Sequence, residues 1–397
     1  MLKGYKYRLN PTEDQIKLIE QTFGCSRLVY NVCLQTKIWA YKDAGIKLSS
    51  FDLCYQLAEA KKEYPWMQVV DSQALQAAVK KVDIAFKNFF RNGGFPKFKG
   101  KSDTQSFQCP NNTRKVDFEK GLLTIPKIKD IPIVISRTFS GKIKTITISR
   151  SPTGKYFASI LVDDGVELPE LPVITKEKSV GLDTGVKSFV ISSNGKIFEA
   201  NRKLKANLTR LRVLSRRASN KKKGSKNRNK ANKRLAALHE KITNKRLDYI
   251  HKVTRDLTSD NQAISTIFVE DLNVSGLLSN HKIAQAMSDA SLGKFYEILK
   301  YKCKWNGINL VKIGRFEPCS KRCSFCGSIK KELKLSEREW TCETCNTSHD
   351  RDINAAKNIL WYGLQQTIFN NTVPAGSWEE PVEQSALMGC YEAGSQR

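Results

Sequence analysis

The chain has 397 residues and carries 67 lysines and arginines against 39 acidic residues, a formal net charge of +28. So many positive charges repel one another in a compact fold unless a polyanion neutralises them. Nucleic acid is the polyanion that we expect, because each phosphate contact also releases counterions. No apolar run approaches the ~20 residues that span a bilayer, and no apolar segment follows the basic start, so we expect no membrane partner and no secretion. In a reducing cytoplasm, the eleven cysteines are better explained as thiols or metal ligands than as disulfides.

The first part of the chain changes from a strand to helices and then to more strands. Residues 5–9 alternate in polarity and predict a strand, and Asn10 is the predicted N-cap of the next helix, with Glu13 three residues beyond it. The helical pattern continues to about residue 92. Residues 105–175 form short alternating runs separated by glycine and proline, which predicts a small β-barrel or sandwich.

Candidate nucleic-acid contacts begin on the helix predicted from Asp71 to Arg91. Gln76 and Lys80 lie on one of its faces, and glutamine and lysine can both read base edges in a major groove. A solvated helix surface is the alternative interpretation of this pattern. Lys97 and Lys99, in the basic loop that follows, are further candidates for contacts with nucleic acid.

A second unit begins near Ser179 with two strands and a basic helical hairpin. The strands are predicted at 180–183 and 188–191, and residues 201–258 carry two leucine-rich seams joined by a lysine-rich turn. Residues 201–250 contain 18 lysines and arginines against two acids, whereas a solvated helix surface usually mixes both signs. We therefore predict an arm that contacts phosphate. Its candidate residues are Lys221, Lys222, Lys223, Lys226 and Arg228.

The remaining elements alternate between strand and helix. Residues 264–269 are an apolar run that predicts a buried strand ending at Glu270, and an amphipathic helix from about residue 292 precedes a further strand at 308–313. A last helix starts near Arg351. Residues 371–397 lack periodicity, so we expect a mobile C-terminal tail.

Four cysteines have the spacing of zinc-ribbon ligands. The two Cys-x-x-Cys pairs, separated by fifteen residues, are Cys323, Cys326, Cys342 and Cys345. Each pair can place two thiolates on one tetrahedral Zn²⁺. Because four cysteines close the coordination shell, we expect one structural zinc and not a catalytic one. Cys319 and His349 lie nearby as alternative ligands.

Three acidic residues stand at the ends of predicted elements. Asp183 ends a strand, Glu270 ends a buried strand, and Asp352 opens the last helix. A helix cap or a salt bridge would explain each acid alone, but an acid at the polar end of an apolar strand must be solvated, paired or metal-bound. Together they predict a site for two Mg²⁺ or Mn²⁺ ions about 4 Å apart, one activating water and one stabilising the leaving oxygen.

Four motifs that contain these residues occur in a fixed order. They are Gly181-Leu182-Asp183-Thr184-Gly185, Val269-Glu270-Asp271-Leu272-Asn273-Val274, Cys323-x-x-Cys326-Gly327 and Asp350-Arg351-Asp352-Ile353-Asn354-Ala355-Ala356. In this the chain resembles the TnpB family, transposon-encoded relatives of the miniature type V CRISPR nucleases. The resemblance implies that Asp183, Glu270 and Asp352 are catalytic. The family usually has serine where Cys319 stands, a change that we expect to leave catalysis intact.

The resemblance implies an α+β multidomain protein with a nuclease at its C-terminal side. A wedge-like β-barrel (1–10 and 105–172) carries a helical recognition insertion (11–104). An RNase H-like (RuvC) nuclease domain (173–319 and 347–370) follows, and it is interrupted by the basic helical arm (201–258) and a zinc ribbon (320–346).

The implied function is RNA-guided cleavage of double-stranded target DNA in the prokaryotic cytoplasm, on the nucleoid. A guide RNA pairs with the target strand, and the protein reads a short flanking motif. Two alternatives stay open. A nuclease-inactive RNA-guided repressor would be expected to lack one of the three acids, and a transposase acting directly on DNA ends would need no guide RNA. A plain zinc-ribbon binding protein leaves Asp183 and Glu270 unexplained.

Overall fold

A computed structural model describes residues 1–91, 93–110, 115–185, 187–201, 203–259, 263–272, 290–334 and 336–369. The predicted mobile tail at 371–397 lies outside these residues. The chain divides after Val166 into two compact units, which are described separately below. In the described part of the chain, no helix combines the length and the apolar character needed to cross a membrane.

The first unit is built on a seven-stranded antiparallel sheet. Its strands are β1 (Leu2–Leu9), β2 (Gln105–Cys109), β3 (Lys115–Asp117), β4 (Leu122–Ile125), β5 (Ile128–Val134), β6 (Lys142–Arg150) and β7 (Tyr156–Asp163). They follow the order β2-β6-β7-β1-β5-β4-β3, so the N-terminal strand lies in the middle of the sheet. The strands predicted over this region are present. Among the described residues no pairing joins β2 to β3, the two strands at the ends of this order, and closure into a barrel stays a prediction.

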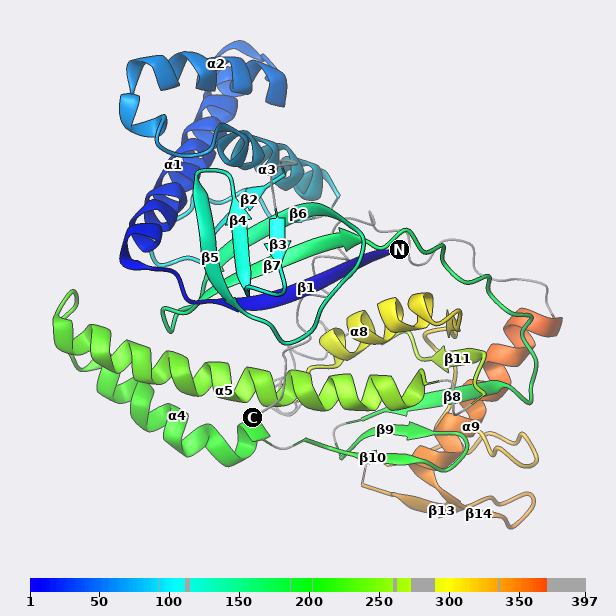
Figure 1. Cartoon of the computed structure of the whole chain (residues 1–397). Coiled ribbons are helices and arrows are strands. Elements are labelled where there is room, and N and C mark those ends of the chain that lie inside the picture. The colour runs from blue at the N-terminus through cyan, green and yellow to red at the C-terminus, as the bar shows by residue number, and fades with distance from the viewer. Residues whose placement is uncertain are drawn as a thin grey trace. The chain divides into compact units, whose positions relative to one another are not determined.

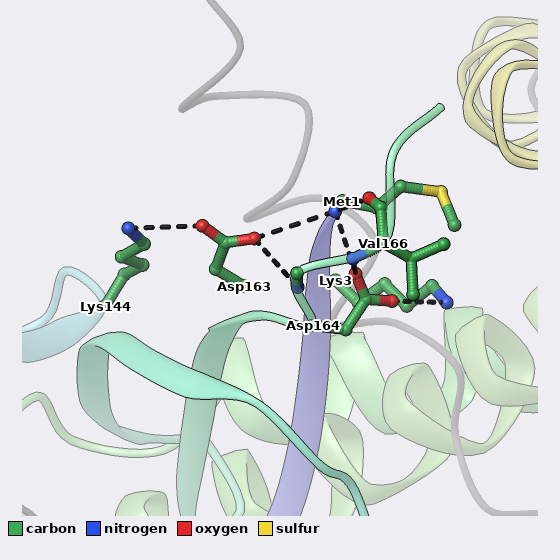
Figure 2. A network of polar contacts seen from close by, with 7 residues as sticks. Met1, Lys3, Lys144, Asp163, Asp164 and Val166 are labelled. Atoms are coloured by element: carbon green, nitrogen blue, oxygen red, sulfur yellow. Dashed lines mark hydrogen bonds and ion pairs between the residues drawn. The ribbon is translucent and has the colours of Figure 1, made fainter. Parts of the chain in front are cut away.

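Ion pairs at the start of β1 hold it along β7, with Leu2 opposite Asp163. Figure 2 shows the Met1 amino group paired with Asp163 and Asp164. It lies 2.8 Å from Asp164 and 3.6 Å from Asp163. Lys3 contacts Asp164 at 2.8 Å, and Lys144 on β6 contacts Asp163 at 3.2 Å. Burial alone would raise the pKa of Asp164, but hydrogen bonds from Lys3 and the amino group hold it well below its ordinary value.

Helices connect β1 to β2 in this unit. They are α1 (Glu13–Ala44), α2 (Ser50–Glu63), the short η1 (Pro65–Met67) and α3 (Ser72–Phe90). The predicted N-cap at Asn10 is wrong, because the Asn10 N–H still donates to Pro132 of the sheet (2.9 Å). Thr12 is the cap instead, and it forms a reciprocal capping box with Gln15.

The second unit contains a five-stranded mixed sheet. Its strands are β8 (Ser179–Thr184), β9 (Ser188–Ser192), β10 (Ile197–Glu199), β11 (Thr266–Val269) and β12 (Asn309–Lys312), in the order β10-β9-β8-β11-β12. The pairs among β10, β9 and β8 are antiparallel, while β8, β11 and β12 run parallel. This mixed order agrees with the RNase H-like sheet expected from the sequence.

Helices cover both faces of this sheet (Figure 1). α5 (Lys226–Leu257) and α8 (Leu292–Trp305) pack on one face, where Val180, Leu182 and Val269 belong to the same buried cluster. α9 (Arg351–Leu364) packs on the other face against Phe268. Side chains alternate along a strand. The strand residues next in sequence to Val180, Leu182 and Val269 therefore point to the face that α9 covers.

The basic arm is the predicted helical hairpin, formed by α4 (Lys203–Ser219) and α5. Leu211, Leu238 and Ile242 are buried together at its seam. The second predicted seam does not continue to Ile250, which packs in the core against the mixed sheet instead. α5 is therefore a continuous 32-residue helix, with its C-terminal end buried in the core of the second unit and its N-terminal end at the basic turn.

Candidate active site and zinc ribbon

Asp183 lies near the end of β8, on the face of the sheet that α9 covers. It shares this face with Gly181, two residues earlier on the strand. A Cβ atom at Gly181 would lie 2.3 Å from the carbonyl oxygen of Ala356 on α9. Only glycine allows so close an approach, so Gly181 brings the helix that carries Asp352 against the strand that carries Asp183.

Glu270 directly follows β11, the strand beside β8. The parallel register pairs Val269 with Leu182, which places Glu270 at the level of Asp183. Alternation also places Glu270 on the same face as Phe268, whose ring packs so closely on α9 that a Cβ at Gly363 would lie 2.1 Å from it. The two carboxylates therefore lie on neighbouring strands and on one face.

Asp352 lies in the first turn of α9, and Asp350 is the N-cap of that helix. The Asp350 carboxylate accepts hydrogen bonds from the backbone N–H groups of Asp352 (3.0 Å) and Ile353 (2.9 Å). Aspartate is among the residues most favoured at an N-cap. The geometry thus favours Asp352 as the acid that joins Asp183 and Glu270.

The charges of Glu270 and Asp352 both act on Asp183. Burial, followed by the charges of Glu270 and Asp352, raises the pKa of Asp183 to about 8. Burial also raises the pKa of Glu270. In the described part of the chain, the four cysteines are the group of three or more ligand residues that gathers closely enough for one metal ion, so the three carboxylates are less tightly gathered than the thiols.

Cations border the acids. Arg338 approaches both oxygens of Asp352, at 3.2 and 3.4 Å. Next to Glu270, the Asp271 carboxylate pairs with Lys312 (2.8 Å) and Arg315 (2.5 Å), and Arg315 also donates to the Asp271 carbonyl (3.4 Å). The contacts of Asp271 hold the backbone in place where it leaves β11, and so they also hold Glu270 in place.

Two further side chains lie beside the acids: Tyr296, which the sequence analysis missed, and Cys319, which it named only as an alternative zinc ligand and a departure from the family. Tyr296 on α8 has its hydroxyl 2.9 Å from Thr184 Oγ1, and burial raises its pKa, with the charges of Glu270 and Asp183 acting in the same direction. Cys319 is buried, and its thiol hydrogen-bonds the Glu270 carboxylate. In the sequence, the signal for Cys319 is that it replaces the serine usual in the family. It places an unusual residue beside a candidate catalytic acid.

The cysteines predicted to bind zinc come together. The four thiol sulfurs of Cys323, Cys326, Cys342 and Cys345 lie within 4.8 Å of one another. Cys323 and Cys345 are 3.7 Å apart, and Cys326 and Cys342 are 3.5 Å apart. Four thiolates about 2.3 Å from one tetrahedral ion stand roughly 3.8 Å apart, so the cluster fits zinc.

The local backbone explains how each pair forms a knuckle. Gly327 and Asn346 follow the second cysteine of each pair with φ of 82° and 53°, the left-handed region in which glycine and asparagine are common. The backbone N–H of each donates to the carbonyl oxygen of the first cysteine of its pair, at 2.9 Å in both cases. The alternative ligand His349 lies outside the four-thiol group, with its Nε2 3.0 Å from the Cys323 sulfur, where it can hydrogen-bond a thiolate.

The zinc ribbon is joined directly to the helix that carries Asp352. β13 (Glu339–Thr341) pairs with β14 (Ser348–Asp350), and α9 begins at the next residue. On α9, Asn354 donates to the Arg322 carbonyl (2.7 Å), and Asn358 donates to the Cys319 carbonyl (2.8 Å). The ribbon therefore positions the N-terminus of α9 from two sides.

The residues predicted to contact nucleic acid are mostly exposed. Exposed side chains are those of Gln76, Lys80, Lys97, Lys221, Lys222, Lys223 and Lys226, whereas Lys99 and Arg228 are half-buried. Arg228 has a structural task, since its guanidinium donates to the Lys221 carbonyl at 2.8 Å across the turn of the arm. Exposure of the others is compatible with phosphate or base contacts.

Comparison with known proteins identifies the family. The chain is 37% identical over 369 residues to a Streptomyces pristinaespiralis protein named as an RNA-guided DNA endonuclease, covering 91% of this chain and 89% of that protein. It is 31% identical over 402 residues to InsQ of Escherichia coli, named in the same way, covering 96% and 98%. The chain belongs to the TnpB family. A mimivirus protein named TnpB-like also matches, at 28% identity over 303 residues, covering 72% of this chain and 50% of that protein.

Family models match three segments of this TnpB-family chain. Residues 160–281 match OrfB_IS605, described as a probable transposase, and residues 293–359 match the Cas12f1-like TNB domain. Residues 1–46 match a helix-turn-helix description, although here they form one strand and one long helix. A Cas12f1–sgRNA–target DNA complex shares the fold, with TM-score 0.56 and 15% identity over 91% of this chain and 98% of that one.

Proposed function

We propose that this protein is an RNA-guided endonuclease that cuts double-stranded DNA beside a short flanking motif. The convergence of Asp183, Glu270 and Asp352, in a chain of the TnpB family, carries the proposal. Relatives that cover nearly the whole chain are named as RNA-guided DNA endonucleases. The presence of all three acids favours a nuclease over a nuclease-inactive RNA-guided repressor.

Asp183, Glu270 and Asp352 would hold two Mg²⁺ or Mn²⁺ ions, for which carboxylate oxygens are suitable ligands. Bound there, the ions would supply a nucleophile from water and stabilise the leaving oxygen of a phosphodiester. Asp183 and Glu270 provide fixed ligands because they stand on neighbouring strands of one sheet. Arg338, beside Asp352, can neutralise a non-bridging phosphate oxygen. Cys323, Cys326, Cys342 and Cys345 would hold one structural Zn²⁺ that keeps α9 in place.

The remaining surfaces suit the nucleic-acid partners. We assign the first unit to the wedge and recognition domains, with Gln76 and Lys80 reading the flanking DNA and Lys97 and Lys99 contacting the backbone. The lysines of the arm would contact guide RNA or DNA phosphates. Such a protein, encoded by a mobile element, would act on the nucleoid in the prokaryotic cytoplasm.

The test is expression of the chain with its native flanking sequence, followed by sequencing of the RNA that copurifies. Replacing the guide segment should redirect cleavage of a plasmid library, and Glu270→Gln should bind the guided target without cutting it. The control is Asp248→Asn, which removes a half-buried acid of the arm that is paired with the exposed Lys252. Strand joining at DNA ends without RNA would overturn the proposal in favour of a transposase.

A further inference from the structure

A cavity in the first unit gathers three cations from separate segments of the chain. Arg27 comes from α1, Lys81 from α3, and Lys99 from the loop before β2. The cavity volume is about 30 Å³. A single water needs roughly 10–15 Å³, so the space admits a small polar group and not a nucleotide base.

Little negative charge balances these cations. The charged groups around Lys81 are Arg27 and Lys99, which line the same cavity, and Asp103, which is exposed and acts on Lys99. Arg27 donates to a neutral partner, the Gln105 side-chain oxygen, at 2.5 Å. Burial, with the neighbouring charge of Lys99, lowers the pKa of Lys81 to about 8. The pocket therefore favours an anion over a neutral or cationic guest.

A buried hydroxyl in the same wall also lacks a partner. Ser26 is 6% exposed, lines the cavity, and has no hydrogen-bond partner for its Oγ among the described residues. Unsatisfied buried polar groups are uncommon, and such a hydroxyl can donate to an oxygen anion. The unpartnered Ser26 hydroxyl is independent of the charges, and it also indicates an anion as the ligand.

Two of the three cations, Arg27 and Lys99, are held in place before any ligand arrives. Asn31 on α1 clamps the Lys99 backbone through both of its amide atoms, at 2.8 and 2.9 Å. The Lys99 ammonium lies 3.7 Å from the centre of the Tyr30 ring. Gln105, which orients Arg27, also donates to the carbonyls of Gly100 and Asp103, at 3.1 and 2.7 Å. A preorganised pocket loses less conformational entropy when it binds.

We propose that the pocket formed by Ser26, Arg27, Lys81 and Lys99 binds one backbone phosphate of the nucleic acid. This inference rests on the proposed function, because it assigns a phosphate of the guide RNA or of the target DNA to the site. The pocket contacts a phosphate and no base edge, so it sets the position of the strand without reading its sequence.

The experiment measures two affinities across a range of salt concentrations. Guide RNA is bound to RNA-free protein in one arm, and target DNA is bound to the RNA-loaded protein in the other. Lys81→Gln should weaken binding about tenfold in one arm and reduce the slope of log affinity against log salt by 0.7–0.9, the value for about one phosphate contact. The arm that changes identifies the strand. Lys62→Gln, an exposed lysine of α2 paired with Glu59, is the control.

Two further variants keep the test decisive if Lys81→Gln folds poorly. Wild-type affinity should fall as the pH rises from 7 to 9, since Lys81 loses its proton near pH 8, and Lys81→Arg should abolish this dependence. Ser26→Ala should weaken binding a few-fold without lowering the melting temperature, because its hydroxyl has no partner to lose.

Unchanged affinity and slope in both arms, for Lys81→Gln and Ser26→Ala, would overturn the inference. Wild-type protein that binds RNA and cuts guided DNA would in that case leave the proposed function intact. Wild-type protein that binds no RNA would instead overturn the proposed function.

Discussion

Two clusters of like charge, one in each compact unit, show opposite versions of the same electrostatic problem. In the nuclease unit, burial and neighbouring carboxylates raise the pKa of Asp183 to about 8. In the first unit, burial and a neighbouring lysine lower the pKa of Lys81 to about 8. Burial opposes the charged form of both side chains: at neutral pH Asp183 is mostly protonated, whereas Lys81 keeps most of its charge at a cost in stability. A ligand of the opposite sign would favour the charged form of each.

The clusters differ in how their groups are held. Asp183 and Glu270 are short side chains on adjacent strands, which suits ligands of fixed geometry such as metal ions. Arg27, Lys81 and Lys99 are long side chains that converge on a cavity, which suits a phosphate group with several oxygens. The comparison indicates that a rigid backbone, in addition to charge, distinguishes a catalytic metal site from a site that binds a nucleic-acid strand.

The largest expected effect breaks the acidic cluster. Asp352→Asn should lower guided DNA cleavage at least about 1000-fold, equivalent to about 4 kcal/mol of transition-state stabilisation, while target binding persists. Asp350→Asn should retain far more activity, because it removes the cap of α9, an effect of about 1 kcal/mol on stability. Cleavage rates with saturating guide RNA measure both. An inactive Asp350→Asn beside an active Asp352→Asn would reverse the assignment.

Loss of zinc should disturb the acidic cluster indirectly. Cys342→Ser should abolish stoichiometric zinc, and it should lower cleavage at least about tenfold, because structural zinc supplies folding energy and the ribbon leads directly into α9. Metal analysis and limited proteolysis measure the first effect. Cys54→Ser, a half-buried thiol on α2, is the matched control. Full activity in zinc-free, folded protein would contradict the role given to the ribbon.

A smaller effect should follow from separating α9 from β8. Gly181→Ala places a Cβ 2.3 Å from the Ala356 carbonyl oxygen, so the helix must shift, at a cost of about 1–3 kcal/mol in the free energy of unfolding. Cleavage should fall as Asp352 moves away from Asp183. Gly24→Ala in α1 is the control, because its Cβ meets nothing within 4 Å and alanine favours helices. Equal unfolding free energies for the two variants would show that the close approach is unimportant.

Much of this organisation follows from the sequence because the signals are local. The spacing of Cys323, Cys326, Cys342 and Cys345 predicts a cluster that the structure contains, and the hairpin of α4 and α5 follows from its leucine periodicity. Asp350 as a cap also follows from local pattern. The convergence of Asp183 with Glu270 was inferred from their places at strand ends and from the family resemblance, and no local pattern shows it, since 86 residues separate them and strand register brings them together.

Other features depend on tertiary contacts that no local pattern encodes. Asn10 looks like a helix cap, yet its N–H donates to Pro132, more than a hundred residues away, and this bond keeps it in the sheet. Lys81 resembles any other lysine of α3, and its place in the cavity depends on α1 and the loop before β2. The prediction that Lys99 contacts nucleic acid rests on its charge alone. The structure gives it partners in Tyr30 and Asn31.

The smallest expected effect concerns the stability of the ligand-free cationic pocket. Below about pH 8, Lys81 is charged in both the folded and the unfolded chain, and its burial destabilises the fold by a constant amount. Between about pH 8 and 10.5 the unfolded chain keeps a proton that the folded chain has lost, so this destabilisation is relieved as the pH rises. Lys81→Met removes the charge and should therefore stabilise the free protein at pH 7.

Thermal unfolding of RNA-free protein measures this effect. The melting temperature of Lys81→Met should exceed that of wild type at pH 7, by about 2–4 °C for each kcal/mol gained, and the difference should shrink towards pH 10. A variant that is more stable and yet binds nucleic acid more weakly would show that Lys81 is retained for its ligand and not for the fold. A lower melting temperature at pH 7 would mean that the ammonium already has a stabilising partner, and the parallel with Asp183 would then fail.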